Sequence, residues 1–327
     1  MASTITRWMN GCAMDWQTID WKALERLRSA FLDGTAGARD YWRNDRDLES
    51  YDQTFGQRIR WKWDYVLKDL QRRGWKPPRG EAVDWGCGSG IATRAFLEHF
   101  GAEPPSKLVL WDRSPGAMQF AARKAREESP KISVWLDRPA GHDFGTLLIS
   151  HVLTELSVEQ VAELLGLAAH ATSVIWVEPG TYELSRRLIA AREQLRGAFQ
   201  VVSPCTHQAA CGMLTPENQR HWCHHFAPPP SDVFTDGNWA RFAKLAGVDL
   251  RSLPVSFLVL DKRPQPNQAN AARVIGRPRV YKAHALVLGC DADGVREHRL
   301  TKRNQPEEFR RLKKGDIPAY RPHSHDG

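Results

Sequence analysis

Short apolar runs alternate with amphipathic stretches from residue 81 onward, and this alternation is typical of a parallel α/β sheet. The predicted strands are residues 82–84, 108–111, 132–135, 146–149, 173–177 and 257–260. The predicted helices between them are residues 91–100, 114–127, 158–169 and 184–196. Ligands in such sheets bind beyond the carboxyl ends of the strands. We therefore expect the functional side chains to follow the apolar runs directly.

The region before residue 81 shows helical patterns instead. Apolar side chains recur at helical spacing in residues 20–32, and a second pattern covers residues 51–70. The second pattern mixes Arg and Lys with tryptophans, and two interpretations of it are open. A basic, aromatic helix can face nucleic acid, or the tryptophans can pack in the core while the charges face water. Residues 1–80 are thus predicted to form a helical N-terminal extension.

A glycine-rich loop, residues 84–90, follows the first predicted strand and precedes a helix. Glycines let the backbone approach a ligand closely, and the helix N-terminus behind them offers free N–H groups. The loop lacks the Gly-Lys-Ser/Thr of a nucleotide-binding P-loop. A dinucleotide fingerprint would need its third glycine at Ile91 or Thr93. The pattern that fits is D-x-G-x-G-x-G, which resembles the first motif of class I S-adenosylmethionine-dependent methyltransferases.

Polar side chains at the ends of four predicted strands complete the expected cofactor site. Asp112 ends the second strand, where a carboxylate reaches ribose hydroxyls. The expected cofactor-binding residues are Asp84, Gly86, Gly88, Gly90, Asp112, Ser150 and Glu178. After the fourth strand, residues 150–153 read Ser-His-Val-Leu, where base-directed amino methyltransferases carry Asn/Asp-Pro-Pro-Tyr. The sequence therefore predicts cofactor binding and identifies no catalytic residue.

Cysteines and histidines concentrate in a polar segment at about residues 203–240. The candidate metal ligands are Cys205, Cys211, Cys223 and the distant Cys290. Four thiolates suit zinc or an iron–sulfur cluster, and the ligand type does not separate the two. The spacing lacks paired C-x₂-C knuckles, so unliganded thiols are a third reading. If Cys290 is only a strand residue, a histidine such as His207, His221 or His224 can complete a zinc site.

The C-terminal region is strongly basic. A Pro-, Gln- and Asn-rich linker covers residues 263–270, and residues 273–314 carry twelve Lys or Arg against five Asp or Glu. This difference of +7 is almost the whole formal net charge of +8. The segment predicts a short antiparallel β unit around Cys290 followed by a helix at residues 306–314. The candidate RNA-binding residues are Arg277, Arg279, Lys282, Lys302, Arg303, Arg310, Arg311, Lys313 and Lys314. A solubilising basic tail is the alternative.

Other bulk properties narrow the class of protein. No apolar run approaches the ~20 residues of a membrane span, so we expect no membrane partner. The N-terminus lacks a secretory apolar core and soon meets acidic residues, unlike a transit peptide. We therefore expect a bacterial cytoplasm in preference to the mitochondrial matrix, with the six cysteines reduced or metal-bound.

The second half of the chain contains several separated motifs: residues 177–181, Pro204-Cys205-x-His207, Cys211, Trp222-Cys223-His224, Phe226, Arg277-Pro278-Arg279, Lys282, Cys290, Thr301-Lys302-Arg303 and Gly315-Asp316. Together they resemble one family, the methyltransferase-like small-ribosomal-subunit assembly proteins of mitochondria and bacteria. The resemblance covers residues 51–316. The resemblance implies S-adenosylmethionine at the glycine loop, a 4Fe–4S cluster on the four cysteines named above, and docking on small-subunit rRNA.

The sequence thus predicts an α/β protein with a class I methyltransferase (Rossmann-like) sheet at residues 81–263 and a small, basic, β-rich C-terminal module at residues 264–327. The cysteine-rich segment is an insertion in the sheet domain, and we expect a monomer. Three hypotheses for function remain. The protein is an rRNA methyltransferase, a non-catalytic assembly factor of the small ribosomal subunit, or a small-molecule methyltransferase with structural zinc.

Overall fold

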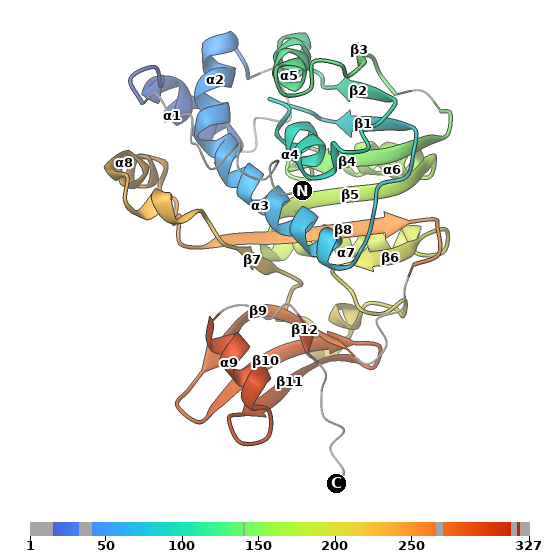
Figure 1. Ribbon diagram of the computed structural model, residues 1–327, viewed down its shortest axis with the longest axis vertical. Helices are drawn as coiled ribbons and strands as arrows, with labels where there is room; N and C mark the ends of the chain where they lie inside the picture. Colours follow the sequence, from blue (N-terminus) through green and yellow to red (C-terminus); the bar gives the residue numbers. More distant parts are fainter. Residues whose placement is uncertain (1–15, 33–40, 140, 266–270, 315–318, 321–327) are drawn as a thin grey trace.

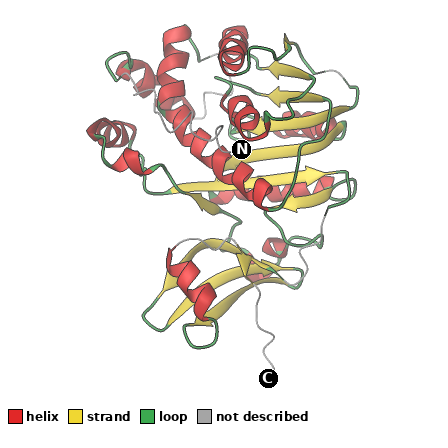
Figure 2. Ribbon diagram, viewed as in Figure 1, coloured by secondary structure: helices red, strands yellow, loops and turns green. Residues whose placement is uncertain are grey.

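The computed structural model describes residues 16–32, 41–139, 141–265, 271–314 and 319–320. Within these residues the chain builds a large mixed sheet with helices on both faces and a small antiparallel sheet below it (Figure 1). Figure 2 shows the same separation, because helices surround the large sheet while the small sheet carries one short helix. No helix in the described residues combines the length and apolar character needed to cross a membrane.

The large sheet has eight strands. Their bounds are β1 (Glu81–Trp85), β2 (Lys107–Trp111), β3 (Val134–Leu136), β4 (Phe144–Ser150), β5 (Ala171–Pro179), β6 (Gln200–Ser203), β7 (His225–Ala227) and β8 (Leu253–Asp261). The strand order is β3-β2-β1-β4-β5-β8-β6, with β7 pairing with another part of β8. Strands β1 to β5 are parallel, whereas β8 runs antiparallel to β5, β6 and β7.

Helices cover both faces of this sheet and form two apolar cores. Their bounds are α1 (Trp21–Leu32), α2 (Asp45–Gln53), α3 (Phe55–Arg72), α4 (Ile91–Phe100), α5 (Pro115–Glu128), α6 (Val158–Ala168), α7 (Tyr182–Leu195) and α8 (Gly237–Ala246). Helices α3, α4 and α5 pack against one face, with Trp63 and Phe96 in the core. Helices α6 and α7 pack against the other face, around Trp176.

The N-terminal helical pattern at residues 51–70 divides at Thr54, which separates α2 from α3. The Thr54 hydroxyl donates a hydrogen bond of 2.6 Å to the carbonyl of Ser50, so it satisfies an end group of α2. Helix α3 then packs against β5, β6, β7 and β8, with Trp61 and Trp63 buried. The core interpretation of these tryptophans is therefore the one that the structure supports.

The small sheet has the order β11-β10-β9-β12. Its strands are β9 (Ala272–Val280), β10 (His284–Asp291), β11 (Gly294–Thr301) and β12 (Ala319–Tyr320), all antiparallel. Helix α9 (Pro306–Lys314) packs on this sheet through the buried side chains of Phe309 and Leu312.

Candidate cofactor pocket and cysteine cluster

The glycine loop joins β1 to α4 and has the backbone conformation that glycine favours. Gly86 and Gly90 have φ angles of 71° and 81°. A Cβ atom on Gly86 would lie 2.8 Å from a methyl group of Val152, and one on Gly90 would lie 2.9 Å from the Cβ of Ala121. Larger residues at either position are therefore excluded by both conformation and space.

Asp112 follows β2 and ties its own strand end to the glycine loop. Its Oδ2 accepts a hydrogen bond of 2.9 Å from the Gly88 amide, and its Oδ1 accepts one of 2.9 Å from the Ser114 amide. The carboxylate thus fixes the distance between the two strand ends and lines the cavity beside them.

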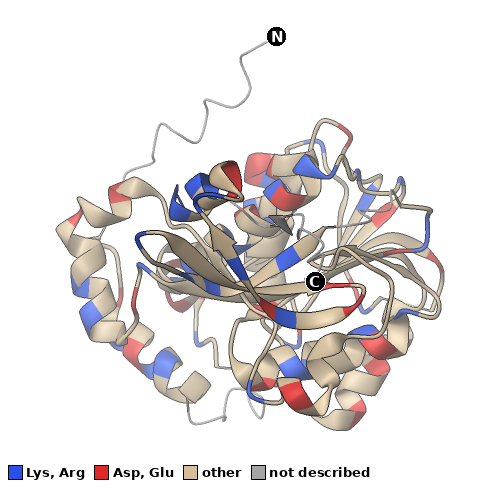
Figure 3. Ribbon diagram, turned by 90° about the horizontal axis from the view of Figure 1, so that it is seen from below, with Lys and Arg blue, Asp and Glu red and all other residues tan. Residues whose placement is uncertain are grey.

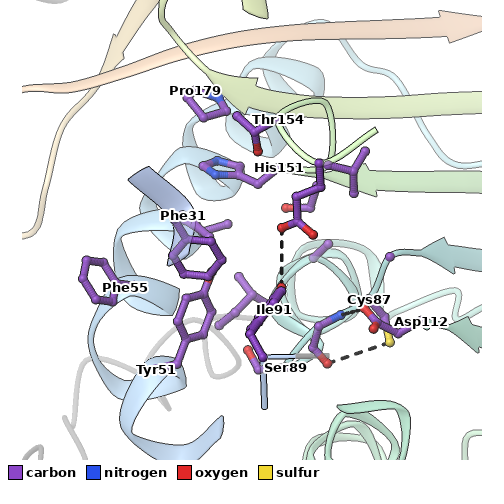
Figure 4. Close-up of a pocket in the computed structure, with 18 of the residues that line it drawn as sticks. Phe31, Tyr51, Phe55, Cys87, Ser89, Ile91, Asp112, His151, Thr154 and Pro179 are labelled. Atoms are coloured by element: carbon purple, nitrogen blue, oxygen red, sulfur yellow. Dashed lines mark hydrogen bonds between the residues drawn. The ribbon is translucent and has the colours of Figure 1, made fainter. Parts of the chain in front are cut away.

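A cavity of about 730 Å³ opens at the carboxyl ends of β1, β2 and β4. This volume lies in the range of small-molecule and cofactor sites. Figure 4 shows Cys87 and Asp112 on one side of the cavity and the rings of Phe31, Tyr51 and Phe55 on the opposite side. The N-terminal helices therefore supply a wall that the sheet alone does not provide.

The segment after β4 supplies the third side of the cavity. The Ser150 hydroxyl accepts a hydrogen bond of 2.9 Å from the Trp63 indole N–H. His151 has a φ of 56°, a conformation that costs a non-glycine residue about 1–3 kcal/mol. Glu178 holds this strained turn, because its Oε1 accepts hydrogen bonds from the Val152 and Leu153 amides at 3.1 and 3.2 Å.

The seven predicted cofactor-binding residues divide into two groups. Those that line the cavity are Gly86, Gly88, Asp112 and Ser150. Asp84, Gly90 and Glu178 lie behind its wall. The Asp84 Oδ2 accepts hydrogen bonds from the Thr93 amide and hydroxyl at 3.2 and 2.7 Å, so it anchors α4 to β1. Burial raises the pKa values of Asp84 and Glu178 to about 7 each.

Helix α3 brings to the cavity two basic residues that were not among those expected at the cofactor site. Arg58 and Lys62 lie one helical turn apart and both line it. Lys62 is only 6% exposed, and burial is the main cause that lowers its pKa to about 7. The sequence does contain one indication of the unusual position of Lys62, which stands between Trp61 and Trp63. A charged residue between two core positions requires a special environment.

The four candidate metal-ligand cysteines come from separate segments. Cys205 follows β6, Cys211 and Cys223 lie in the loops before β7, and Cys290 is in β10. The first three line one cavity of about 30 Å³, and Cys290 packs with Cys211 and Cys223 in one apolar cluster. Among the described residues, no group of three or more His, Cys, Asp or Glu side chains has a metal-binding arrangement.

Two histidines contact this cysteine cluster, which we define as Cys205, Cys211, Cys223 and Cys290. The Cys290 sulfur lies 3.6 Å from the His207 Nε2, and the Cys223 sulfur lies 3.8 Å from the His225 Nε2. Burial and the neighbouring sulfurs raise the pKa of the Cys211 thiol to about 11 and also hold the pKa values of Cys223 and Cys290 well above the usual value.

A buried ionic network joins α3, the start of the cysteine-rich segment and the C-terminal sheet. The Asp69 carboxylate accepts hydrogen bonds from Arg73, Ser203 and Arg273, the last at 3.1 Å. Arg73 also donates to the Pro204 and Cys205 carbonyls. Arg273, on β9, is 1% exposed. It belongs to the basic C-terminal segment by sequence, yet its charge is used inside the protein.

The nine predicted RNA-binding residues are all exposed. A backbone hydrogen bond of 3.0 Å from Lys302 to the Ala283 carbonyl brings Lys282 near Lys302 and Arg303. Arg279 forms an ion pair with Glu297, and the Arg277 guanidinium lies 4.3 Å from the centre of the Phe226 ring.

The other predicted residues on this side, Arg310, Arg311, Lys313 and Lys314, lie on the outer side of α9. Figure 3 looks at this end of the molecule and shows acidic positions among the basic ones.

The fold and the cavity together define a protein of the class I S-adenosylmethionine-dependent methyltransferase fold, as the sequence predicted. The chain belongs to the family described as mitochondrial small ribosomal subunit Rsm22, whose model matches residues 66–317. This match confirms the family resemblance read from the motifs.

Solved structures with a similar arrangement include several methyltransferases. One is magnesium protoporphyrin IX methyltransferase from Synechocystis with bound S-adenosylmethionine, at 14% identity over 75% of this chain and 98% of that chain, with a TM-score of 0.39. Another is an rRNA methylase from Escherichia coli, at 12% identity over 75% of this chain and 78% of that chain, with a TM-score of 0.39. A comparison with curated proteins found no match.

Proposed function

We propose that the protein binds S-adenosylmethionine in the 730 Å³ cavity and methylates the rRNA of the small ribosomal subunit. The observation that carries this proposal is the cavity itself, which lies at the carboxyl ends of β1, β2 and β4 and is walled by the glycine loop and Asp112. Family membership supports the ribosomal partner, because the family is described by the small ribosomal subunit.

The residues present fit this cofactor. Gly86 and Gly88 leave the cavity wall free of side chains, and Asp112 offers a carboxylate beside them. When bound, S-adenosylmethionine supplies an electrophilic methyl group. The chain's own contribution is to align an acceptor with that group and exclude water, and alignment alone can supply much of the rate enhancement.

The cysteine cluster is proposed to hold a 4Fe–4S cluster, with zinc as the alternative. The support is the donor set, since four thiols from separate segments gather in one place, where Cys211 and Cys290 are buried and Cys205 and Cys223 half-buried. Metal binding requires thiolates, so the raised pKa values of the Cys211, Cys223 and Cys290 thiols mean that loading must release protons and that affinity must rise with pH. Bound metal would fasten Cys290, and with it the C-terminal sheet, to the larger domain.

The exposed Lys and Arg residues of the C-terminal sheet and α9 are proposed to contact rRNA phosphates. Replacing Arg310 with Gln should weaken binding to small-subunit rRNA and lower the slope of log affinity against log salt by about 1. A Lys68→Gln variant on the exposed side of α3 is the matched control for loss of one charge.

The decisive experiment maps rRNA methylation in a deletion strain. One methyl group restored by the wild-type chain and not by Asp112→Ala is the expected result. Isothermal titration should show that Asp112→Ala binds S-adenosylmethionine at least 10-fold more weakly than wild type.

A different result of the methylation mapping would support the alternative function, a non-catalytic assembly factor. Residues 150–153 lack the Asn/Asp-Pro-Pro-Tyr segment, and this observation favours that alternative. The assembly-factor alternative predicts that the methylation map is unchanged in the deletion strain and that the chain co-sediments with small-subunit particles. Absence of co-sedimentation would instead favour a small-molecule methyltransferase.

The metal is tested separately. Anaerobically purified protein should be brown and contain iron and sulfide, whereas colourless protein with stoichiometric zinc would contradict the iron–sulfur assignment. The expected compartment remains a bacterial cytoplasm, and the family description names mitochondria as the other possibility.

A further inference from the structure

The cavity has two unlike halves. The glycine-loop half carries backbone amides and the Asp112 carboxylate. The other half is walled by α1, α2 and α3, together with the segment between α8 and β8. It contains the aromatic rings of Phe31, Tyr51 and Phe55 (Figure 4). Rings of this kind stack on planar heterocycles, and every nucleobase presents such a face.

Two of the polar groups that line this second half are basic. Arg58 and Lys62 line it, and the Arg58 Nε is buried with no hydrogen-bond partner among the described residues. His151, at the junction of the halves, likewise has a buried Nε2 without a partner there. Unpaired buried polar atoms are costly, so their presence in a cavity points to groups that a ligand would satisfy.

We propose that this second half is the methyl-acceptor site, that it takes a nucleobase of single-stranded RNA, and that the Lys62 amine accepts the proton released by the acceptor nitrogen. This proposal rests on the proposed methyltransferase function. The acceptor lone pair forms the new N–C bond, the methyl C–S bond breaks, and its electron pair stays on sulfur. The proton that the ring or exocyclic nitrogen loses passes to the Lys62 Nζ.

The surroundings of Lys62 explain how an amine can serve as a base at neutral pH. Burial and, after it, Arg58 on the same helix disfavour the charged form of Lys62, while the Glu178 carboxylate on β5 favours it. His151 faces the same region, and burial, Lys62 and Arg58 hold its pKa well below the usual value, so it stays neutral. The net result is a pKa of about 7 for Lys62, near the optimum for a general base.

Three variants test this role. Lys62→Met removes the amine at similar length, Lys62→Arg keeps a cation that does not deprotonate at neutral pH, and Lys68→Met is the control on the exposed side of the same helix. We expect both Lys62 variants to lose 100-fold or more in rRNA methylation, with unchanged affinity for S-adenosylmethionine. The control should stay within twofold of wild type.

A readout independent of activity uses the Cε resonance of Lys62 in protein carrying isotope-labelled lysine, assigned by its absence from Lys62→Met. It should titrate with a midpoint near 7, and a single-stranded RNA oligonucleotide of random sequence should shift it without shifting the Lys68 signal. A midpoint above 9, or no response to RNA, overturns the proposal.

Failure of the Lys62 role and failure of the proposed methyltransferase function give different results. Methylation by Lys62→Met within threefold of wild type overturns the role of Lys62 and leaves the proposed function standing. If Lys62→Met loses methylation and Lys62→Arg retains it, proton acceptance by Lys62 is overturned, and only its positive charge matters. A wild-type chain that binds S-adenosylmethionine and methylates no rRNA overturns the proposed enzyme and the Lys62 role together.

Discussion

The 730 Å³ cavity and the cysteine cluster lie near opposite ends of helix α3, and they are assembled in opposite ways. The glycine loop is continuous in sequence, and its shape follows from backbone conformation at Gly86 and Gly90. The cysteine cluster draws on segments as far apart as Cys205 and Cys290. One site depends on local geometry, and the other depends on long-range contacts that hold separate segments together.

This difference teaches where each site is vulnerable. A change in the glycine loop should act locally, through strain and space. A change near the cysteine cluster should act globally, because Asp69 holds α3, the start of the cysteine-rich segment and the C-terminal sheet at once. Four substitutions test this difference between local and global effects, from the largest expected effect to the smallest.

Replacing Asp69 with Asn should destabilise the protein most. The change leaves the buried guanidinium of Arg273 without its anionic partner, and breaking a buried ion pair in this way costs about 3–5 kcal/mol. The free energy of unfolding, measured by urea denaturation, should fall by that amount. A loss below about 1 kcal/mol would show that the cysteine region does not depend on this network.

Replacing Gly90 with Ala should cost more than the same change at Gly88. Both positions have positive φ, but only at Gly90 would the new Cβ meet Ala121, at 2.9 Å. The difference in unfolding free energy between the two variants should be about 1–3 kcal/mol, the usual cost of overpacking. Equal losses would mean that backbone strain alone restricts the loop.

Asp84→Asn should change how stability depends on pH. The folded pKa of Asp84 is about 7, well above the usual value near 4. Between those values the folded chain keeps a proton that the unfolded chain has lost, so this group's contribution to stability falls as pH rises.

The variant lacks that contribution, so its stability relative to wild type should rise by on the order of 1 kcal/mol per pH unit between about pH 5 and 7. Thermal unfolding of both proteins across this interval measures the difference. Parallel curves for the two proteins would contradict the raised pKa.

Glu297→Gln should have the smallest effect. Its partner Arg279 is exposed, and such surface ion pairs contribute about 0–1 kcal/mol. The melting temperature should therefore barely change, while affinity for small-subunit rRNA at low salt should rise about twofold as Arg279 is released. A large loss of stability would show that the outer side of the C-terminal sheet is more than a docking surface.

Periodicity predicted the parallel part of the large sheet well, because strands β1 to β5 are short apolar runs with helices between them. It also predicted α9 with the bounds that the structure has, residues 306–314. Strands β6 and β7 were not predicted. Four-residue Gln200–Ser203 and three-residue His225–Ala227 are too short to show a period, and pairing with β8 defines them.

The candidate site shows the same division between residues that a local pattern predicts and residues that only tertiary packing places. The glycine loop and Asp112 could be predicted, since a contiguous motif and a strand end carry them. Arg58 and Lys62 could not be assigned to a cavity, because the tryptophans beside Lys62 indicate only an unusual environment. Nothing local shows whether a basic side chain of this helix faces a cavity or water. Only the packing of α3 against the sheet makes that distinction. Arg273 shows the reverse case, a residue counted with the basic surface that lies in the interior.

The position of β8 has a consequence for biosynthesis. Strands β1 to β5 can pair with one another as they leave the ribosome, in the order in which they are made. Within the part of the chain that the structure describes, β6 pairs only with β8, and β8 ends at Asp261. At about 5–20 residues per second, the roughly sixty residues between them delay that pairing by several seconds. During this interval the nascent chain exposes the edge of β5 and the unpaired β6. We expect chaperones to bind the chain at these exposed strand edges.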